Sequence, residues 1–142
     1  MPFISVTRLR VRRLRFLPAF FFHAGRAQRQ LRGAAGFAGG ALLPDRRWTF
    51  WTLTGWDDAA SMRAYMLGGP HKAAMPRLMH WCDEASVVHW ETDAPGLPGW
   101  DEAEARMRRD GRPSRLLHPG ADHAAMAFAP MRPGRGAAIA PR

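Results

Sequence analysis

The segment Trp48-Thr49-Phe50-Trp51-Thr52-Leu53-Thr54-Gly55-Trp56-Asp57-Asp58 carries the clearest structural signal in the chain. It begins as a run of aromatic and β-branched residues, which favour the half-buried surface of a sheet. The run stops at Gly55. Asp57 or Asp58 can then accept a hydrogen bond from a free N–H of a first helical turn, and either carboxylate suits the positive end of a helix dipole. The segment therefore predicts a strand that leads directly into a helix.

The flanking sequence predicts further strands and helices in a simple order. Pro18 suits the first turn of an amphipathic helix, and Pro70 suits the start of another after the break at Gly68-Gly69. The order is strand, helix, strand, strand, helix, strand, which is that of a split βαβ unit. The expected strands span residues 3–13, 36–43, 48–55 and 85–92, and the expected helices span 17–32 and 58–67, with a continuation from residue 70.

This order predicts an α+β, ferredoxin-like domain with a four-stranded antiparallel sheet and two helices on one face. The other sheet face needs a cover, and its aromatic content suggests that a second copy supplies it, as in a dimeric α/β barrel. We expect one domain over residues 1–118, ending with a short helix over 101–109. Residues 119–142 have no hydrophobic period and are expected to form a flexible tail.

Composition limits the class of protein. The 142 residues suit one domain, and 46% are hydrophobic, which is enough for a core. A single cysteine, Cys82, excludes an intramolecular disulfide and a cysteine-based zinc site, and suits a reducing cytoplasm. The apolar run 16–22 is too short for a membrane span and contains a proline, and we find no secretory signal.

The charge is strongly basic. The chain has 21 Lys and Arg against 12 Asp and Glu, a formal net charge of +9. Such a balance suits nucleic acid or an acidic membrane surface. However, the arginines are spread along the chain, and no nucleic-acid recognition motif accompanies them. The sequence therefore does not predict a nucleic-acid partner.

Three motifs together resemble a known family. They are Phe50-Trp51-Thr52-Leu53-Thr54-Gly55-Trp56-Asp57-Asp58, Met62-Arg63-Ala64-Tyr65 and Gly69-Pro70-His71-Lys72-Ala73-Ala74-Met75. In these motifs the chain resembles the spheroidene-monooxygenase-like branch of the dimeric α/β-barrel superfamily, whose members are often called antibiotic-biosynthesis-monooxygenase-like. The resemblance covers about residues 3–118.

The resemblance implies an oxidoreductase of the monooxygenase type. Its expected substrate is a hydrophobic small molecule, bound in a pocket between the sheet and the helices. The superfamily includes haem enzymes and cofactor-free oxygenases, so the cofactor is haem or none. Cofactor-free oxygenation needs a substrate that can be deprotonated and then react with oxygen. The alternative is a non-catalytic dimer that binds a small ligand or haem in the same place.

His71 is the candidate catalytic and cofactor-binding residue. It stands in the first turn after Pro70, where the helix dipole disfavours the imidazolium and keeps a neutral ring available as ligand or base. The resemblance places it in the most recognisable motif of the branch. The alternative is that it caps the helix or fills the rim of the core.

Six further residues are candidates for the pocket walls. Aromatic and methionine side chains at these spacings also suit an ordinary core, and a sheet histidine can simply be hydrogen-bonded. No phosphate-binding loop, nucleophile elbow or paired-histidine metal helix is present, so we expect no metal site. The candidate wall residues are Phe20, His23, Trp51, Trp56, Met75 and His89.

Overall fold

The computed structural model describes residues 2–132 and 136–142. Its strands are β1 (Phe3–Val11), β2 (Phe37–Asp45), β3 (Thr49–Trp56), β4 (Cys82–Glu91), β5 (Arg112–Pro113) and β6 (Ala137–Ile139). Its α-helices are α1 (Leu17–Arg32), α2 (Ala59–Met66), α3 (Gly69–Trp81) and α4 (Trp100–Asp110), with short 3-10 turns η1 (Leu14–Phe16) and η2 (Arg46–Trp48).

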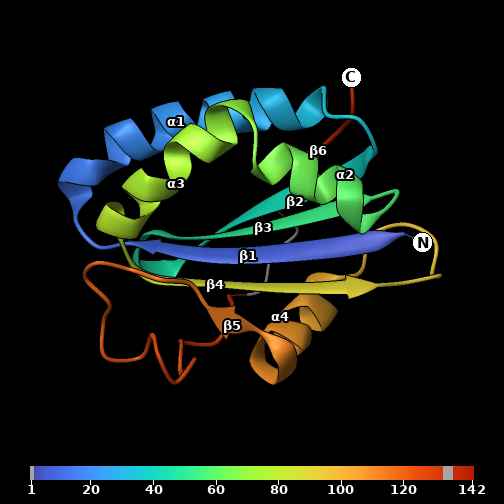
Figure 1. Ribbon diagram of the computed structural model, residues 1–142. Coiled ribbons are helices and arrows are strands. Elements are labelled where there is room, and N and C mark those ends of the chain that lie inside the picture. The colour runs from blue at the N-terminus through green and yellow to red at the C-terminus, as the bar shows by residue number, and fades with distance from the viewer. Residues whose placement is uncertain (1, 133–135) are drawn as a thin grey trace.

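The predicted α+β, ferredoxin-like architecture is confirmed. One antiparallel sheet has the strand order β5-β4-β1-β3-β2-β6, with α1, α2 and α3 on one face and α4 on the other (Figure 1). The sheet has six strands rather than the four expected. The two additional strands lie at the edges, and each is too short to show the alternation by which a strand is recognised in sequence.

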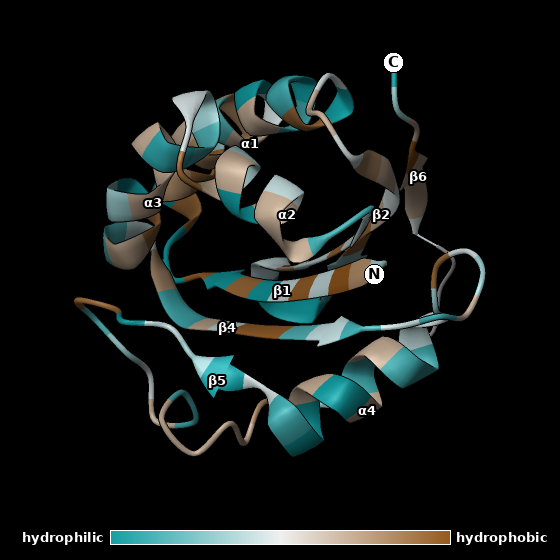
Figure 2. Cartoon of the chain, turned by 45° about the vertical axis from the view of Figure 1, so that its right-hand side comes forward, coloured by the Kyte–Doolittle hydropathy of each residue, from teal (hydrophilic) through white to brown (hydrophobic). Residues whose placement is uncertain are grey.

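Alternation along the central strands separates two layers of side chains. Figure 2 shows hydrophobic and hydrophilic residues alternating along β1. Ile4 and Val6 pack with Ala103 and Met107 of α4, so the intervening Ser5 faces the helices α1–α3. We call these two sides of the sheet the α4-facing side and the helix-facing side.

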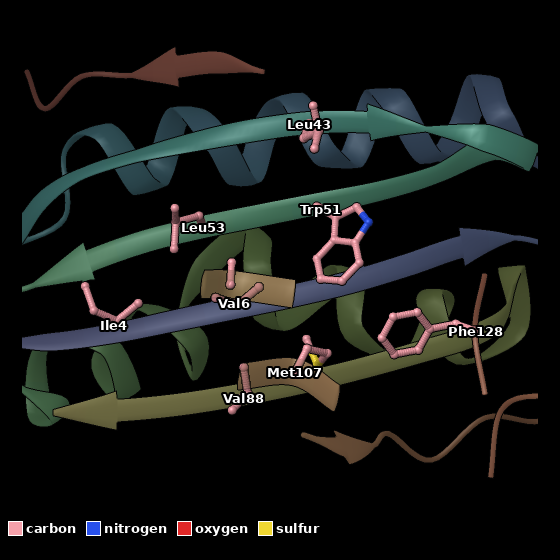
Figure 3. Packing of buried hydrophobic residues seen from close by; sticks show 9 residues of the cluster. Ile4, Val6, Leu43, Trp51, Leu53, Val88, Met107 and Phe128 are labelled. Carbon is pink, nitrogen blue, oxygen red and sulfur yellow. The ribbon is translucent and has the colours of Figure 1, made fainter. Parts of the chain in front are cut away.

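The α4-facing side is fully covered by the chain itself. Nine buried residues form its core, and α4 and the segment around Phe128 lie over the strands (Figure 3). The expectation that a second copy covers this face is therefore not met, because the chain folds its own C-terminal part over it. The nine residues are Ile4, Val6, Leu43, Trp51, Leu53, Val88, Ala103, Met107 and Phe128.

The region expected to be a flexible tail is part of the packed structure where it is described. Phe128 is 5% exposed and Ile139 is 4% exposed. Ile139 lies in β6, which pairs with β2. His123 is also buried, and its Nε2 donates a hydrogen bond to the Ser114 carbonyl at 2.8 Å. Isolated apolar residues in an irregular segment have no period, so the sequence did not reveal this packing.

A buried ion pair crosses the α4-facing side between β1 and β4. Arg8 donates a hydrogen bond to Glu84, and both side chains are almost fully buried. The Arg8 guanidinium also lies 4.4 Å from the Phe128 ring centroid. Burial lowers the pKa of Arg8, and the hydrogen bond and charge of Glu84 oppose this effect. Arg10 beside it binds Asp83 through two hydrogen bonds.

Most predicted strands differ from the structure by one or two residues at an end, and the starts of β4 and α4 also differ from the prediction. β4 begins at Cys82, directly after α3, and not at residue 85. α4 begins at Trp100 after an N-cap at Gly99, so Asp101 lies inside the first turn and does not cap the helix. In the described ranges, no helix combines the length and the apolar character of a membrane-spanning segment.

Candidate functional site

The helix-facing side of the sheet has two hydrophobic clusters, one at each end. The first joins α1, α2, β2, β3 and β6, and the second joins α1, α3 and the far end of β1. Bulky side chains therefore hold the helices on the sheet at both ends. The first cluster contains Leu31, Phe37, Trp56, Met62 and Ile139, and the second contains Val11, Leu17, Phe20 and Trp81.

Between the clusters, the helix-facing side carries small and polar residues. Strand pairing aligns them in two rows across β3, β1 and β4, which we call the middle rows. Thr7, Thr52, Val87 and His89 in these rows are partly exposed, whereas their neighbours on the α4-facing side are buried, except for the partly exposed Trp90. The helices therefore leave the centre of this side incompletely covered. The middle rows are Thr52-Thr7-Val87 and Thr54-Ser5-His89.

Helix α3 helps to leave the centre of this side incompletely covered, because one of its faces has a small residue, Ala74, between the larger His71 and Leu78. His71, Ala74, Leu78 and Trp81 recur at intervals of three or four residues, so they share one face of the helix. Ala74 and Trp81 are buried, and Leu78 packs against the second cluster. This face therefore runs from the second cluster back to His71.

The environment of His71 keeps its ring neutral and oriented. Burial lowers the pKa of His71, and the hydrogen bond to the Met66 carbonyl opposes that shift. The bond length is 3.2 Å, and the ring Nδ1 must donate in it, since a carbonyl only accepts. The proton therefore resides on Nδ1, and Nε2 carries the lone pair of a base or ligand. The Tyr65 ring lies 4.8 Å away, centroid to centroid.

Gln30 holds the junction that carries His71. Its side-chain amide donates to the carbonyls of Tyr65 and Gly68, at 3.1 and 3.0 Å. Its Oε1 accepts from the backbone N–H of His71 at 2.8 Å. One side chain of α1 therefore hydrogen-bonds to backbone groups at the end of α2 and the start of α3, and it joins the three helices at this junction.

The structure brings together only part of the predicted site. Trp56 is buried, donates a hydrogen bond to Thr54, and lies 5.5 Å from the Tyr65 ring, which in turn contacts His71. His89 lies in the middle rows, where its ring contacts Phe3, and burial lowers its pKa. Phe20 belongs to the second cluster at the other end.

Three predicted wall residues lie elsewhere. Trp51 is fully buried on the α4-facing side, separated from His71 by the sheet. Met75 is 40% exposed on α3. His23 is partly exposed on α1, with its ring 5.6 Å from that of Trp81.

Two residues near His71 were missed. Helical spacing places Gln30 with the polar residues of α1, away from the core, yet it is half-buried against α2 and α3. The sequence gives only a weak signal that Gln30 is half-buried. Gln30 lies next to the buried Leu31, at the edge of the apolar stripe of α1, and such a position can face a neighbouring helix. Tyr65 belongs to the predicted apolar side of its helix. Its contact with His71 follows from the fold of the α2–α3 junction and not from spacing.

The surface has two concavities that concern the site. His71 lines neither of them, although Gln30 and Pro70 beside it line the larger one. One, of about 440 Å³, is lined by Arg26, Arg29, Gln30, Gly33, Pro70 and Arg142. The other, of about 10 Å³, lies on the α4-facing side beside Arg8, Glu84 and His123. Within residues 2–132 and 136–142, no three His, Cys, Asp or Glu side chains are arranged to hold a metal ion. The neutral His71 has the donor chemistry of a haem ligand, but neither concavity offers it the volume for a haem.

Comparisons with known proteins identify the fold. Rv0793 from Mycobacterium tuberculosis is 9% identical with a TM-score of 0.60, over 68% of this chain and 100% of that chain. An antibiotic biosynthesis monooxygenase is 10% identical with a TM-score of 0.58, over 65% and 99%. A variant of SnoaB, a cofactor-independent oxygenase from Streptomyces nogalater, is 17% identical with a TM-score of 0.53, over 67% and 98%. A search of curated proteins gives no match.

These solved structures share the ferredoxin-like fold of antibiotic-biosynthesis-monooxygenase-like proteins, and at such low identity the likeness concerns the fold alone. The match to a family model covers a larger part of the chain than these solved structures do. The family model described as a domain of unknown function, DUF3291, matches residues 23–134. Because this match spans most of the chain, the protein belongs to the DUF3291 family.

Proposed function

We propose that this protein is a monooxygenase-like oxidoreductase that acts on a hydrophobic small molecule between the middle rows and helices α1–α3. The observation that carries the proposal is the state of His71. Its Nδ1 proton is held by the Met66 carbonyl, and burial lowers its pKa, so Nε2 is available as a base at neutral pH. Thr7, Thr52, Val87 and His89 of the middle rows are partly exposed, and they support the proposal that an apolar molecule lies against this side of the sheet.

The chemistry that suits this arrangement is oxygenation without a cofactor. A substrate CH₂ group that is conjugated with a carbonyl, directly or through an aromatic ring, loses a proton to Nε2 of His71 and forms a carbanion. The carbanion reacts with O₂, and loss of water from the resulting hydroperoxide leaves a carbonyl group. Overall, one CH₂ and one O₂ give one C=O and one H₂O, so the substrate supplies the electrons. A positioned base contributes about 100-fold or more to such a rate.

We further propose three properties that the likeness in fold does not itself show. The first is membership of the spheroidene-monooxygenase-like branch, on the motifs around Trp51, Tyr65 and His71. The second is a location in the cytoplasm, which the single cysteine suits. The third is a homodimer, but one formed through a surface other than the α4-facing side, since the chain covers that side itself.

The test uses anthrone, a flat apolar ketone with an acidic CH₂ group. We expect the purified protein to consume O₂ and form anthraquinone, and His71→Gln to lower the rate about 100-fold. His80→Gln is the matched control, because His80 is exposed on the same helix, and it should retain the wild-type rate. Haemin is added separately to wild type and His71→Ala, and their absorbance spectra are compared.

The outcomes separate the alternatives. A haemin Soret band that shifts with wild type but not with His71→Ala would replace the cofactor-free proposal with a haem site at His71. Binding of anthrone without O₂ uptake would indicate a non-catalytic binding protein. Equal rates in His71→Gln and wild type would remove His71 as the base.

A further inference from the structure

Four large apolar side chains are exposed at one end of the molecule. Leu14 of η1 is 63% exposed, Phe21 and Phe22 of α1 are 50% and 60% exposed, and Trp48 of η2 is 49% exposed. Single exposed apolar residues are ordinary, but several aromatic side chains gathered at one place indicate an interaction surface. We call these four residues the aromatic patch.

The residues of the aromatic patch come from segments that the fold brings to the same end. β1 ends, and α1 and β3 begin, at one end of the sheet (Figure 1). Phe21 of α1 contacts Phe50 of β3 with a ring-centroid distance of 5.5 Å, and Trp48 lies two residues before Phe50. Leu14 lies in the turn that connects β1 to α1. The patch is therefore a product of tertiary structure.

The surroundings of the patch are positively charged. Segments 12–32 and 46–56 contain no Asp or Glu. Within the described part of the chain, no salt bridge pairs any of the seven exposed arginines in these segments with a carboxylate. Apolar side chains are thus interleaved with uncompensated cationic ones. The seven arginines are Arg13, Arg15, Arg26, Arg29, Arg32, Arg46 and Arg47, of which Arg29 and Arg32 lie in the last turn of α1, away from the patch.

We propose that the aromatic patch docks the protein on an anionic lipid surface. Phe and Trp side chains enter the interfacial region of a bilayer, and arginines beside them bind lipid phosphates. Charge complementarity disfavours a second copy, because a two-fold contact would bring the arginines of both copies together. The apolar composition of the patch favours lipid over nucleic acid. Leu14, Phe21 and Phe22 provide apolar area, and they have no hydrogen-bond donor or acceptor that could read a base.

The docking surface goes beyond the proposed oxygenase function and does not depend on it. Phe20 and Phe21 both contact Phe50, and Phe50 packs against the second cluster. A docked protein therefore turns the Phe20 end of its helix-facing side toward the bilayer. Vesicle binding is measured without substrate, so its failure and the failure of the oxygenase proposal are separate results.

The experiment measures co-sedimentation of the full chain with phosphatidylcholine vesicles, with and without phosphatidylglycerol. We expect binding only to the anionic vesicles, with a loss at high salt. Phe22→Ser should lower the partition coefficient about tenfold, since it removes one buried aromatic side chain. Arg13→Gln and Arg15→Gln should each lower it about fivefold. Leu67→Ser and Arg63→Gln are the matched exposed controls, because both lie at the C-terminal end of α2, near Gln30 at the other end of α1, and they should bind like wild type.

Three results would overturn the proposal. The first is equal loss of binding in the patch variants and in the controls, which would indicate attraction by net charge alone. The second is a dimer in sedimentation that Phe22→Ser dissociates, which would assign the patch to a second copy. The third is binding to duplex DNA, weakened by the same variants, in protein that does not bind anionic vesicles.

Discussion

Gln30 of α1 and His71 of α3 are joined by a hydrogen bond of 2.8 Å, in which Oε1 of Gln30 accepts from the backbone N–H of His71. The amide group of the same side chain donates to the carbonyls of Tyr65 and Gly68. His71 is thereby held at the start of its helix by a residue 41 positions earlier in the chain. The orientation of the candidate base depends on a contact between helices.

Gln30→Ala should destabilise the protein by about 2 kcal/mol, because three half-buried hydrogen bonds are lost. Urea unfolding followed by circular dichroism measures the change. Gln28→Ala is the control on the same helix, where no side-chain hydrogen bond is recorded among the described residues, and it should cost less than about 0.5 kcal/mol. Equal destabilisation in the two variants would show that the contact between the helices contributes nothing.

The lowered pKa of His71 makes stability depend on pH. The unfolded chain, with a histidine pKa near 6.5, binds a proton before the folded protein does. The stabilisation is therefore complete above pH 6.5 and is lost as the pH falls from there through the lower folded pKa. Thermal unfolding measured across this range should show a smaller decrease for His71→Gln than for wild type. Parallel curves would contradict the burial of a neutral His71.

Phe128→Ala should destabilise the protein by about 3 kcal/mol, because Phe128 is buried over Arg8 and Trp51. The control is Leu117→Ala, an exposed position in the same C-terminal region, which should change stability by less than about 0.5 kcal/mol. Urea unfolding of both variants makes the comparison. A negligible cost at Phe128 would mean that the C-terminal segment does not cover the sheet in solution.

Glu84→Ala should cost about 3 kcal/mol or more, since it leaves the buried Arg8 guanidinium without its partner. Asp83→Ala removes a carboxylate from the more exposed Arg10 and should cost about 1 kcal/mol. Replacing Arg8 and Glu84 together by Met and Leu should recover most of the loss. Failure of the double variant to recover would point to packing around the pair, and not to an unpaired charge, as the cause.

Local signals in the sequence were sufficient for the central fold. The aromatic and β-branched run before Gly55 specifies β3. Asp58 caps α2 by accepting a hydrogen bond from the Ser61 backbone N–H at 2.8 Å, as its position predicts. Both signals act within a few residues, so they can be read without knowing the partners of either element. The order of such elements then restricts the sheet to a few topologies.

The candidate site could be predicted only in part. Helix-start chemistry singled out His71, and alternation placed His89 on one face of its strand. Whether Trp51 belongs to the same pocket depends on which side of the sheet its side chain faces. That in turn depends on which segments pack against each side. Trp51 points to Met107 and Phe128. Met107 belongs to the short helix that was predicted without a packing partner, and Phe128 belongs to residues 119–142, which were expected to form a flexible tail.

The amino-acid sequence alone determined the elements that depend on neighbours along the chain: the strand before Gly55, the capped helix after it and the start of the helix that carries His71. Tertiary structure decided what covers each sheet face, which side chain fixes His71 and where the exposed aromatic residues gather. The reason is physical. Periodicity and capping operate over one or two turns of chain, whereas the contacts of Phe128, Gln30 and Phe21 join segments whose proximity exists only after folding.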